Sequence, residues 1–358
     1  MTLLELLVVV AILAVLATVA IQSTTDIGNQ TRYDATQKSI GAFRTAVLGP
    51  PGQTAPDGAL MATGFIADMG RVPRSRNLTH PEFGEVPDLT ELYSESLPSG
   101  LKAYALHTAG EGNVALTAIT AVSLNTIAER TALYDATVKI PAGWRGPYLR
   151  KPPTELTLVD GWQKPLVSRV DMGSTLAELQ AWPTMLLRFR TGEQFELQED
   201  ANYTAITETN RDVVGVFSVS GFEGAPASTD AYSGRFYSTI QNNEYQVKLV
   251  VSVAIPTSGI YPSLKAASSY ILISLFGPNP EVASASDGRP VRAWVHQIPY
   301  TTNTSDNVSV EFDGVHAPTI GTRVIRAILK GTNAIPIKGR VVYAPISSGS
   351  QTISIQFP

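Results

Sequence analysis

An uncharged, mainly apolar run lies at the start of the chain. Residues 6 to 25 contain no Asp, Glu, Lys or Arg, and Asp26 is the first charged residue after Glu5. A helix rises ~1.5 Å per residue and about 20 apolar residues cross a bilayer, so the run is expected to form a membrane-spanning helix. Weak helix formers between Gln22 and Asn29 predict local unwinding at its end.

Helical periodicity resumes after this segment. Tyr33, Ile40, Phe43 and Val47 are spaced to share one face. That face is expected to pack against a globular head. The helix should end at residues 49–52, Gly-Pro-Pro-Gly, because proline lacks the backbone N–H. We therefore expect one helix over residues 1–48, within an N-terminal unit of residues 1–50.

The pattern changes from about Leu186 to short β-rich runs separated by turns. Nine strands are predicted, at residues 213–219, 235–240, 245–255, 270–276, 291–298, 308–312, 322–329, 339–344 and 352–357. They fit a β-sandwich that fills a domain of residues 186–358. Residues 51–185 are then expected to form a separate first head.

Composition narrows the function classes. The chain has 358 residues, of which 44% are hydrophobic, so it can bury two or three cores. A net charge of -4 gives no sign of a nucleic-acid surface. The absence of cysteine excludes disulfides, thiolate metal sites and a cysteine nucleophile.

Catalytic motifs are missing, so we predict no enzyme, no cofactor and no metal site. The histidines do not have metal-ligand spacing; they are His80, His107, His296 and His316. Asp287-Gly288 and Asp313-Gly314 are typical of hairpin turns, although a calcium ion beside them stays an alternative.

Glu5 carries the most informative charge. A carboxylate within a membrane costs ~2.5–3.5 kcal/mol at a helix centre and needs a cationic partner. No Lys or Arg lies near Glu5 along the helix, and its own α-amino group at Met1 is out of reach, so the partner is expected on a second copy. A signal peptide would begin with positive charge, which residues 1–4 lack, and a plain membrane anchor would not require Glu5.

The segment Thr2-Leu3-Leu4-Glu5-Leu6, followed by Val8-Val9-Val10-Ala11-Ile12-Leu13, closely resembles the mature N-terminus of type IV pilins and type II secretion pseudopilins. The resemblance implies that the chain is the processed form and that its first residue is N-methylated. It also implies an assembly contact made by Met1, Thr2 and Glu5. The residues implied to pack in a filament core are Leu3, Leu6, Val9, Leu13 and Leu16. Met1 stands where the family usually has Phe, and Gln22 where many members have Pro.

Two later segments are similar to elements of the major pseudopilin, namely Gly-Pro-Tyr-Leu at residues 146–149 and Asp-Gly-Trp-Gln-Lys-Pro at residues 160–165. We interpret Trp144, Tyr148 and Trp162 as core of the head; a sugar- or peptide-binding cleft lined by these aromatics is the alternative. The expected fold is α+β: a long hydrophobic helix on a pilin-like antiparallel-sheet head, followed by a C-terminal β-sandwich.

The resemblance implies a structural subunit of a type IV pilus-like filament or pseudopilus that polymerises through its N-terminal helix. Its partners would be copies of itself, the inner membrane before assembly, a prepilin peptidase and an assembly machinery, with no nucleic acid. It would end on the cell surface or in a periplasmic pseudopilus. The alternative is a minor or tip pilin, or a membrane-anchored adhesive module. The sandwich is expected to face outward, so a chain ending near Trp182 should still polymerise.

Overall fold

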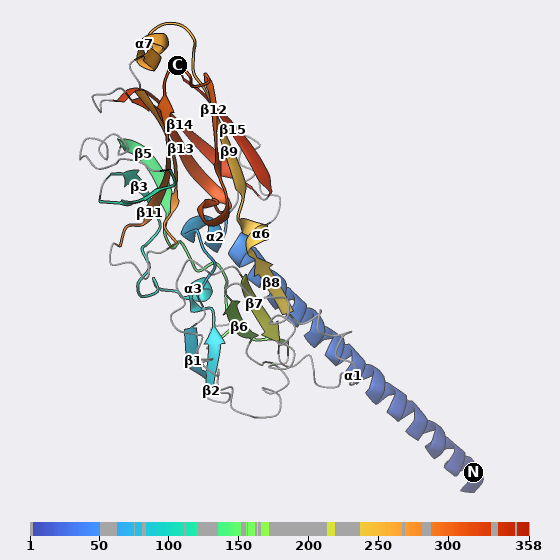
Figure 1. Cartoon of the computed structure of the whole chain (residues 1–358). Helices are drawn as coiled ribbons and strands as arrows, with labels where there is room; N and C mark the ends of the chain where they lie inside the picture. The colour runs from blue at the N-terminus through green and yellow to red at the C-terminus, as the bar shows by residue number, and fades with distance from the viewer. Residues whose placement is uncertain are drawn as a thin grey trace.

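In the computed structural model a single long helix leads into a β-rich head (Figure 1). The structure describes residues 3–50, 63–74, 76–80, 84–110, 112–120, 135–151, 155, 157–161, 163, 166–171, 213–218, 237–266, 269–280, 288–330, 336–347 and 349–357. Strands make up 41% of the structure and helices 28%, so β-sheet is the main component.

Helix α1 (Leu3–Leu48) runs without a break. Three hydroxyls in its exposed part, those of Thr18, Thr24 and Thr31, donate to the carbonyl oxygen four residues earlier at 2.6, 2.8 and 2.9 Å. These side chains are satisfied within the helix and leave its backbone bonds intact. The unwinding predicted for residues 22–29 is therefore wrong.

The predicted end of the helix is confirmed. α1 stops at Leu48, and Gly49 takes a φ of 91°, which few residues other than glycine adopt. A Cβ atom on Gly49 would lie 1.5 Å from the carbonyl oxygen of Thr63. The returning chain thus passes so close to the helix end that only glycine fits there.

None of the described helices is long and apolar enough to cross a membrane. In α1 the exposed large apolar side chains reach from Leu6 to Ile21 before the polar segment begins. That stretch is about 24 Å of helix, less than the ~30 Å of a hydrocarbon core. The predicted membrane-spanning helix is wrong, and so is the α+β fold class built on a long hydrophobic helix.

The nine strands predicted after residue 186 are confirmed as β7 to β15, with ends shifted by a few residues. The strands are β1 (Arg76–His80), β2 (Gly84–Asp88), β3 (Ala105–Ala109), β4 (Val114–Ala118), β5 (Asp135–Ala142), β6 (Leu166–Asp171), β7 (Val213–Ser218), β8 (Tyr237–Gln241), β9 (Lys248–Ala254), β10 (Ser269–Pro278), β11 (Val291–Tyr300), β12 (Asn307–Phe312), β13 (Gly321–Lys330), β14 (Pro336–Ile346) and β15 (Ser350–Gln356). The short helices are α2 (Phe65–Met69), α3 (Thr90–Tyr93), α6 (Asn242–Tyr245), α7 (Tyr261–Ala266) and η4 (Gly314–His316).

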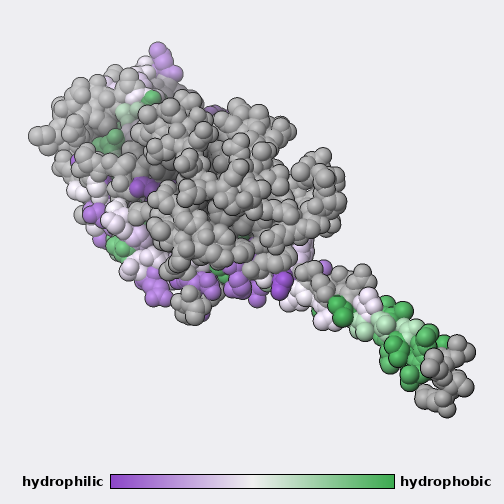
Figure 2. All heavy atoms as spheres, turned by 90° about the horizontal axis from the view of Figure 1, so that it is seen from below, coloured by the Kyte–Doolittle hydropathy of each residue, from purple (hydrophilic) through white to green (hydrophobic). Residues whose placement is uncertain are grey.

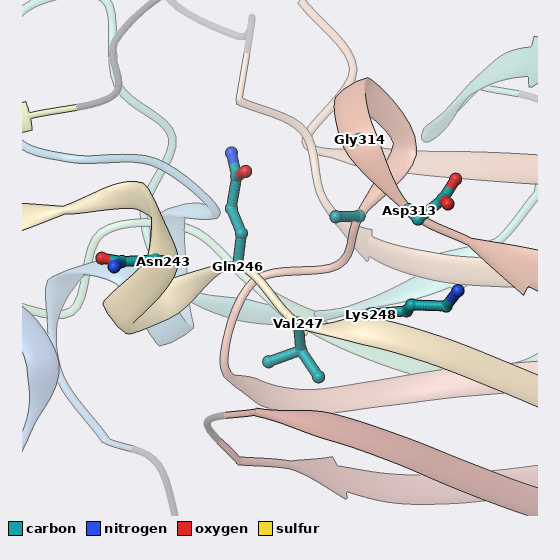
Figure 3. Close-up of a pocket in the computed structure, with 7 residues that line it drawn as sticks. Asn243, Gln246, Val247, Lys248, Asp313 and Gly314 are labelled. Carbon is teal, nitrogen blue, oxygen red and sulfur yellow. The ribbon is translucent and has the colours of Figure 1, made fainter.

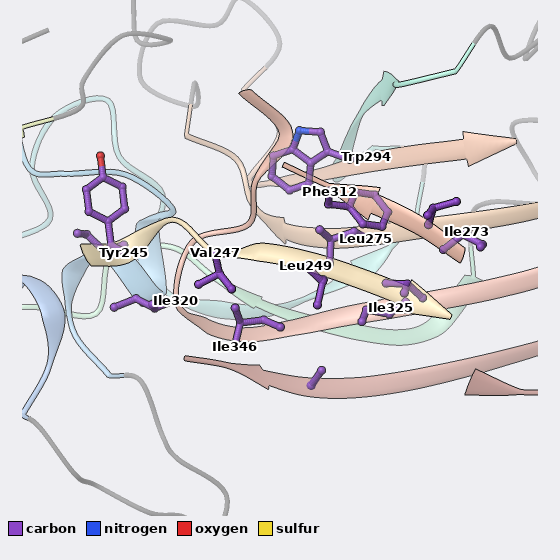
Figure 4. Packing of buried hydrophobic residues seen from close by; sticks show 14 of the residues in the cluster. Tyr245, Val247, Leu249, Ile273, Leu275, Trp294, Phe312, Ile320, Ile325 and Ile346 are labelled. Carbon is purple, nitrogen blue, oxygen red and sulfur yellow. The ribbon is translucent and has the colours of Figure 1, made fainter. Parts of the chain in front are cut away.

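Two sheets enclose the main core. One has the order β14-β13-β10-β11-β4 and the other β12-β9-β15. Strand β12 alternates exposed and buried residues, as a half-buried strand requires. Buried side chains from both sheets point between them, among them Leu249, Ile273 and Phe312 (Figure 4). Burying each such side chain contributes about 1.5–3 kcal/mol.

The pilin-like antiparallel head expected for residues 51–185 is also wrong. Among the described strands of that region, β1 pairs with β2 and β3 with β5, but β4 joins the sandwich. There it pairs in parallel with β11, and β6 pairs with β7. Strands from both sides of residue 185 are thus hydrogen-bonded to each other. The division into units 1–50, 51–185 and 186–358 stays a prediction.

Candidate functional site

The C-terminal part of α1 is built into the head. Ile40, Phe43 and Val47 are buried, and Phe43 and Val47 belong to the main hydrophobic cluster. Arg44 forms an ion pair with Glu244 of α6. Together these contacts fix the direction in which the rest of α1 leaves the head.

A second contact lies one turn earlier, where the turn at Gly161 rests on α1. The N–H of Gly161 donates to the hydroxyl of Thr36 at 2.9 Å, and that hydroxyl donates to the carbonyl oxygen of Arg32 at 2.9 Å. A Cβ atom on Gly161 would lie 2.0 Å from the same carbonyl oxygen. The Asp-Gly turn seen in the sequence therefore packs directly against the helix and holds the head on it.

The N-terminal part of α1 projects from the head (Figure 1), and its apolar side chains are exposed (Figure 2). Between Leu6 and Ile21 the large apolar side chains are 44–67% exposed. They lie on every side of the helix, because residues 6–10 are all apolar and successive residues turn by ~100°. A helix that is apolar all round is normally buried on all sides. This stretch of α1 is the candidate functional site.

The structure places four of the predicted core-packing residues along this stretch. Leu6, Val9, Leu13 and Leu16 are exposed on α1. Leu3 and Glu5 belong to the same helix, while Met1 and Thr2 lie outside the described residues. The helix therefore brings Leu6, Val9, Leu13 and Leu16 of the core-packing set into one exposed rod about 24 Å long.

The predicted head-core residues lie elsewhere, in the head, where Tyr148 contacts Phe65 of α2. Trp144 is buried, and Tyr148 packs partly buried against the same cluster. The ring of Tyr148 meets Phe65 edge-on with centroids 5.5 Å apart. Trp162 lies outside the described residues.

A buried polar network surrounds these aromatics. Tyr148 donates its hydroxyl to Asp68 at 3.0 Å, and Arg145 pairs with the same carboxylate at 2.9 Å. Burial raises the pKa of Asp68 to about 6, with Arg145 opposing the shift. Arg323 of β13 is fully buried and donates to the carbonyl oxygens of Ala67 and Ile320 at 3.1 and 2.7 Å. The network therefore joins α2 to the sandwich.

A hollow of about 230 Å³ lies between α6 and the turn after β12 (Figure 3). It is lined by Asn243, Gln246, Val247, Lys248, Asp313, Gly314 and Ala317. Lys248 is already paired with Glu311 at 2.8 Å. Charges of both signs and amides share the lining, so its chemistry does not converge on one ligand group.

Within the part of the chain that the structure describes, no group of three or more His, Asp or Glu side chains could hold a metal ion. Asp313 precedes η4, and Asp287 lies outside the described residues. His296 has an Nε2 atom 3.1 Å from the carbonyl oxygen of Glu311, and burial lowers its pKa. This histidine serves packing against Phe312, whose ring centroid is 5.0 Å away.

Asp88, at the end of β2, is a buried carboxyl that sequence reasoning missed. One of its oxygens accepts the N–H of Leu89 at 2.9 Å, and the other has no hydrogen-bond partner among the residues that the structure describes. Burial raises its pKa from 3.8 to about 7, against the opposing effects of the Leu89 N–H and Lys151. A raised carboxyl pKa means that the folded state favours the neutral form.

This shift predicts the pH dependence of stability. The favourable contribution of neutral Asp88 is complete below pH 4 and is lost as the pH rises to about 7. The decrease in unfolding free energy between low and high pH should be smaller in the Asp88→Asn variant, by on the order of 3 kcal/mol. Denaturant unfolding of both proteins at pH 4 and pH 8 measures it. Parallel pH profiles of the two proteins would contradict the prediction.

No protein-family model, curated protein or solved structure matches this chain.

Proposed function

We propose that this chain is a structural subunit of an extracellular filament of the type IV pilus or pseudopilus kind, and that copies assemble through the exposed stretch of α1. The observation that carries the proposal is the stretch of α1 from Leu6 to Ile21, which is apolar and exposed on all sides. The C-terminal end of the same helix is fixed in the head. Each such side chain that becomes buried contributes about 1.5–3 kcal/mol.

The distribution of these side chains favours a polymer over a dimer. One neighbouring helix covers one stripe, so a helix that is apolar all round needs several neighbours. Head-to-tail contacts between copies build helical filaments when the rotation from one copy to the next does not close into a ring. The resemblance of residues 2–13 to pilins supports the same proposal, with a prepilin peptidase and an assembly machinery as partners and the cell surface or periplasm as location. The inner-membrane stage stays a prediction.

A charge in the rod tests the proposal. Leu13→Asp should lower the filament yield by more than tenfold, because an unpaired buried charge costs several kcal/mol and about 1.4 kcal/mol is tenfold. Leu13→Met, which keeps size and polarity, is the matched control and should assemble. Sedimentation and electron microscopy give the yield, and circular dichroism checks the head. Equal yields from both variants would refute the assembly role of α1.

A further inference from the structure

The carboxylate of Asp68 in α2 holds the segment of residues 143–149 at two points. Its Oδ1 atom accepts a hydrogen bond from Nη2 of Arg145 at 2.9 Å, and its Oδ2 atom accepts the hydroxyl of Tyr148 at 3.0 Å. The hydroxyl oxygen of Tyr148 in turn accepts the backbone N–H of Arg145 at 2.9 Å. The three residues therefore close a ring of hydrogen bonds in which both carboxylate oxygens face donors.

This ring suits only an ionised carboxyl group. An ionised carboxylate is purely an acceptor, whereas the neutral acid carries an O–H donor on one of its oxygens. A proton on Oδ1 would point at the guanidinium of Arg145, which has no acceptor. A proton on Oδ2 would displace the hydrogen that Tyr148 donates there. Protonation of Asp68 therefore breaks one of the two bonds and removes the charge that attracts Arg145.

The surroundings let Asp68 take up this proton while the head stays folded. Asp68 is buried, and burial raises its pKa to about 6 against the opposing effects of Arg145 and Tyr148 of the same segment and Arg323 of β13. Burial and the charge of Asp68 also raise the pKa of Tyr148, which keeps its proton as a donor. A raised carboxyl pKa means that the folded state favours the neutral form, so the proton does not unfold the head.

The outer end of the ring lies at the surface of the head. The side chain of Arg145 is 49% exposed, and its guanidinium lies 4.1 Å from the ring centroid of Tyr104. The residues around it are held independently, because the N–H groups of Trp144 and Leu149 donate to backbone carbonyl oxygens at 2.8 and 2.9 Å. Loss of the bond to Asp68 therefore frees the side chain of Arg145 while the segment stays in place.

We propose that Asp68 is a proton switch: its ionised form clamps Arg145 onto the head, and its neutral form releases the Arg145 guanidinium to solvent. The surface of the head then gains a free cation in mild acid. The proposal concerns the head alone and does not depend on filament formation. It differs from a purely structural role of Asp68, which would hold Arg145 equally at every pH.

Chemical modification of Arg145 in the 358-residue chain tests the proposal. A dicarbonyl reagent modifies guanidinium groups, and peptide mass spectrometry reports Arg145 relative to Arg32, which is exposed on α1 and serves as the internal standard. The ratio should rise severalfold from pH 8 to pH 5, with a midpoint near pH 6. Asp68→Asn places an N–H donor where the neutral acid has its O–H, so the ratio should stay at its acid value throughout. Asp88→Asn is the matched control and should keep the transition.

A second variant covers the case in which Asp68→Asn does not fold. Tyr148→Phe removes one donor to the carboxylate, so Asp68 should take up its proton more readily and the midpoint should move to higher pH. An equal ratio at pH 5 and pH 8 in the parent chain would overturn the proposal. A transition that survives in Asp68→Asn, disappears in Asp88→Asn, or keeps its midpoint in Tyr148→Phe would overturn it as well.

Discussion

A chain that ends near Trp182 will fail to form a folded head. It would lose β11, to which β4 is hydrogen-bonded, and β7, to which β6 is hydrogen-bonded. It would also lose the sandwich part of the cluster that buries Phe43 and Val47 of α1. The sequence predicts the opposite, a first head that folds without the sandwich. One core contains residues from before and after Trp182. The truncation should therefore remove the whole folding free energy of a domain, about 5–15 kcal/mol.

Circular dichroism and limited proteolysis of the shortened chain measure this effect. The matched control is a chain that lacks residues 1–21, which removes the exposed stretch from Leu6 to Ile21 but no buried residue of α1 that packs in the head, and it should keep a cooperative unfolding transition. A chain ending near Trp182 that resists protease and unfolds cooperatively would show that the first head is independent.

Arg71→Ala should destabilise the head by about 3–5 kcal/mol. Arg71 donates from both terminal nitrogens to the carboxylate of Glu91, at 2.9 and 3.1 Å, and the two side chains are only 4% and 0% exposed. Burial alone would raise the pKa of Glu91, but the charge and hydrogen bonds of Arg71 and the N–H and charge of Arg74 together outweigh it, so the pKa lies below its ordinary value. Removing Arg71 takes away the bidentate partner of this buried carboxylate and leaves the N–H of Arg74, 2.9 Å from Glu91, and the charge of Arg74 to stabilise it.

Chemical denaturation of the variant and the parent gives the difference in unfolding free energy. Lys248→Met is the control, because it breaks the Lys248–Glu311 pair, whose side chains are about half exposed, and it should hardly move the midpoint. A double variant, Arg71→Met with Glu91→Leu, should recover most of the lost stability, since it removes both buried charges. An unchanged midpoint for Arg71→Ala would contradict the account of this pair.

The features that sequence predicted correctly are local in the chain. The end of α1 at Gly49 and the nine later strands follow from spacing, alternation and turn residues within a few positions. The unbroken helix through residues 22–29 was missed because threonine is a weak helix former on average. Here the hydroxyls of Thr24 and Thr31 bond back to the helix.

The features that the sequence did not predict depend on contacts between segments that are far apart in the chain. Strand β4 pairs with β11 about 180 residues later, and no periodicity within either strand encodes that partner. Buried charges were missed for the same reason: Arg323 reaches Ala67 across 256 positions. One local signal was available, because Glu91 stands between Leu89 and Leu92, both of which are buried. The exposed rod of α1 was found because its residues are contiguous.

The most direct test of the central claim compares the 358-residue chain with a chain that lacks residues 1–21, both purified and concentrated in the same aqueous buffer. Light scattering and negative-stain electron microscopy report the size of the assemblies. The account predicts filaments from the 358-residue chain and folded single subunits from the shortened one, because the shortened chain lacks the apolar stretch from Leu6 to Ile21. Filaments of equal length and number from both chains would contradict assembly through α1.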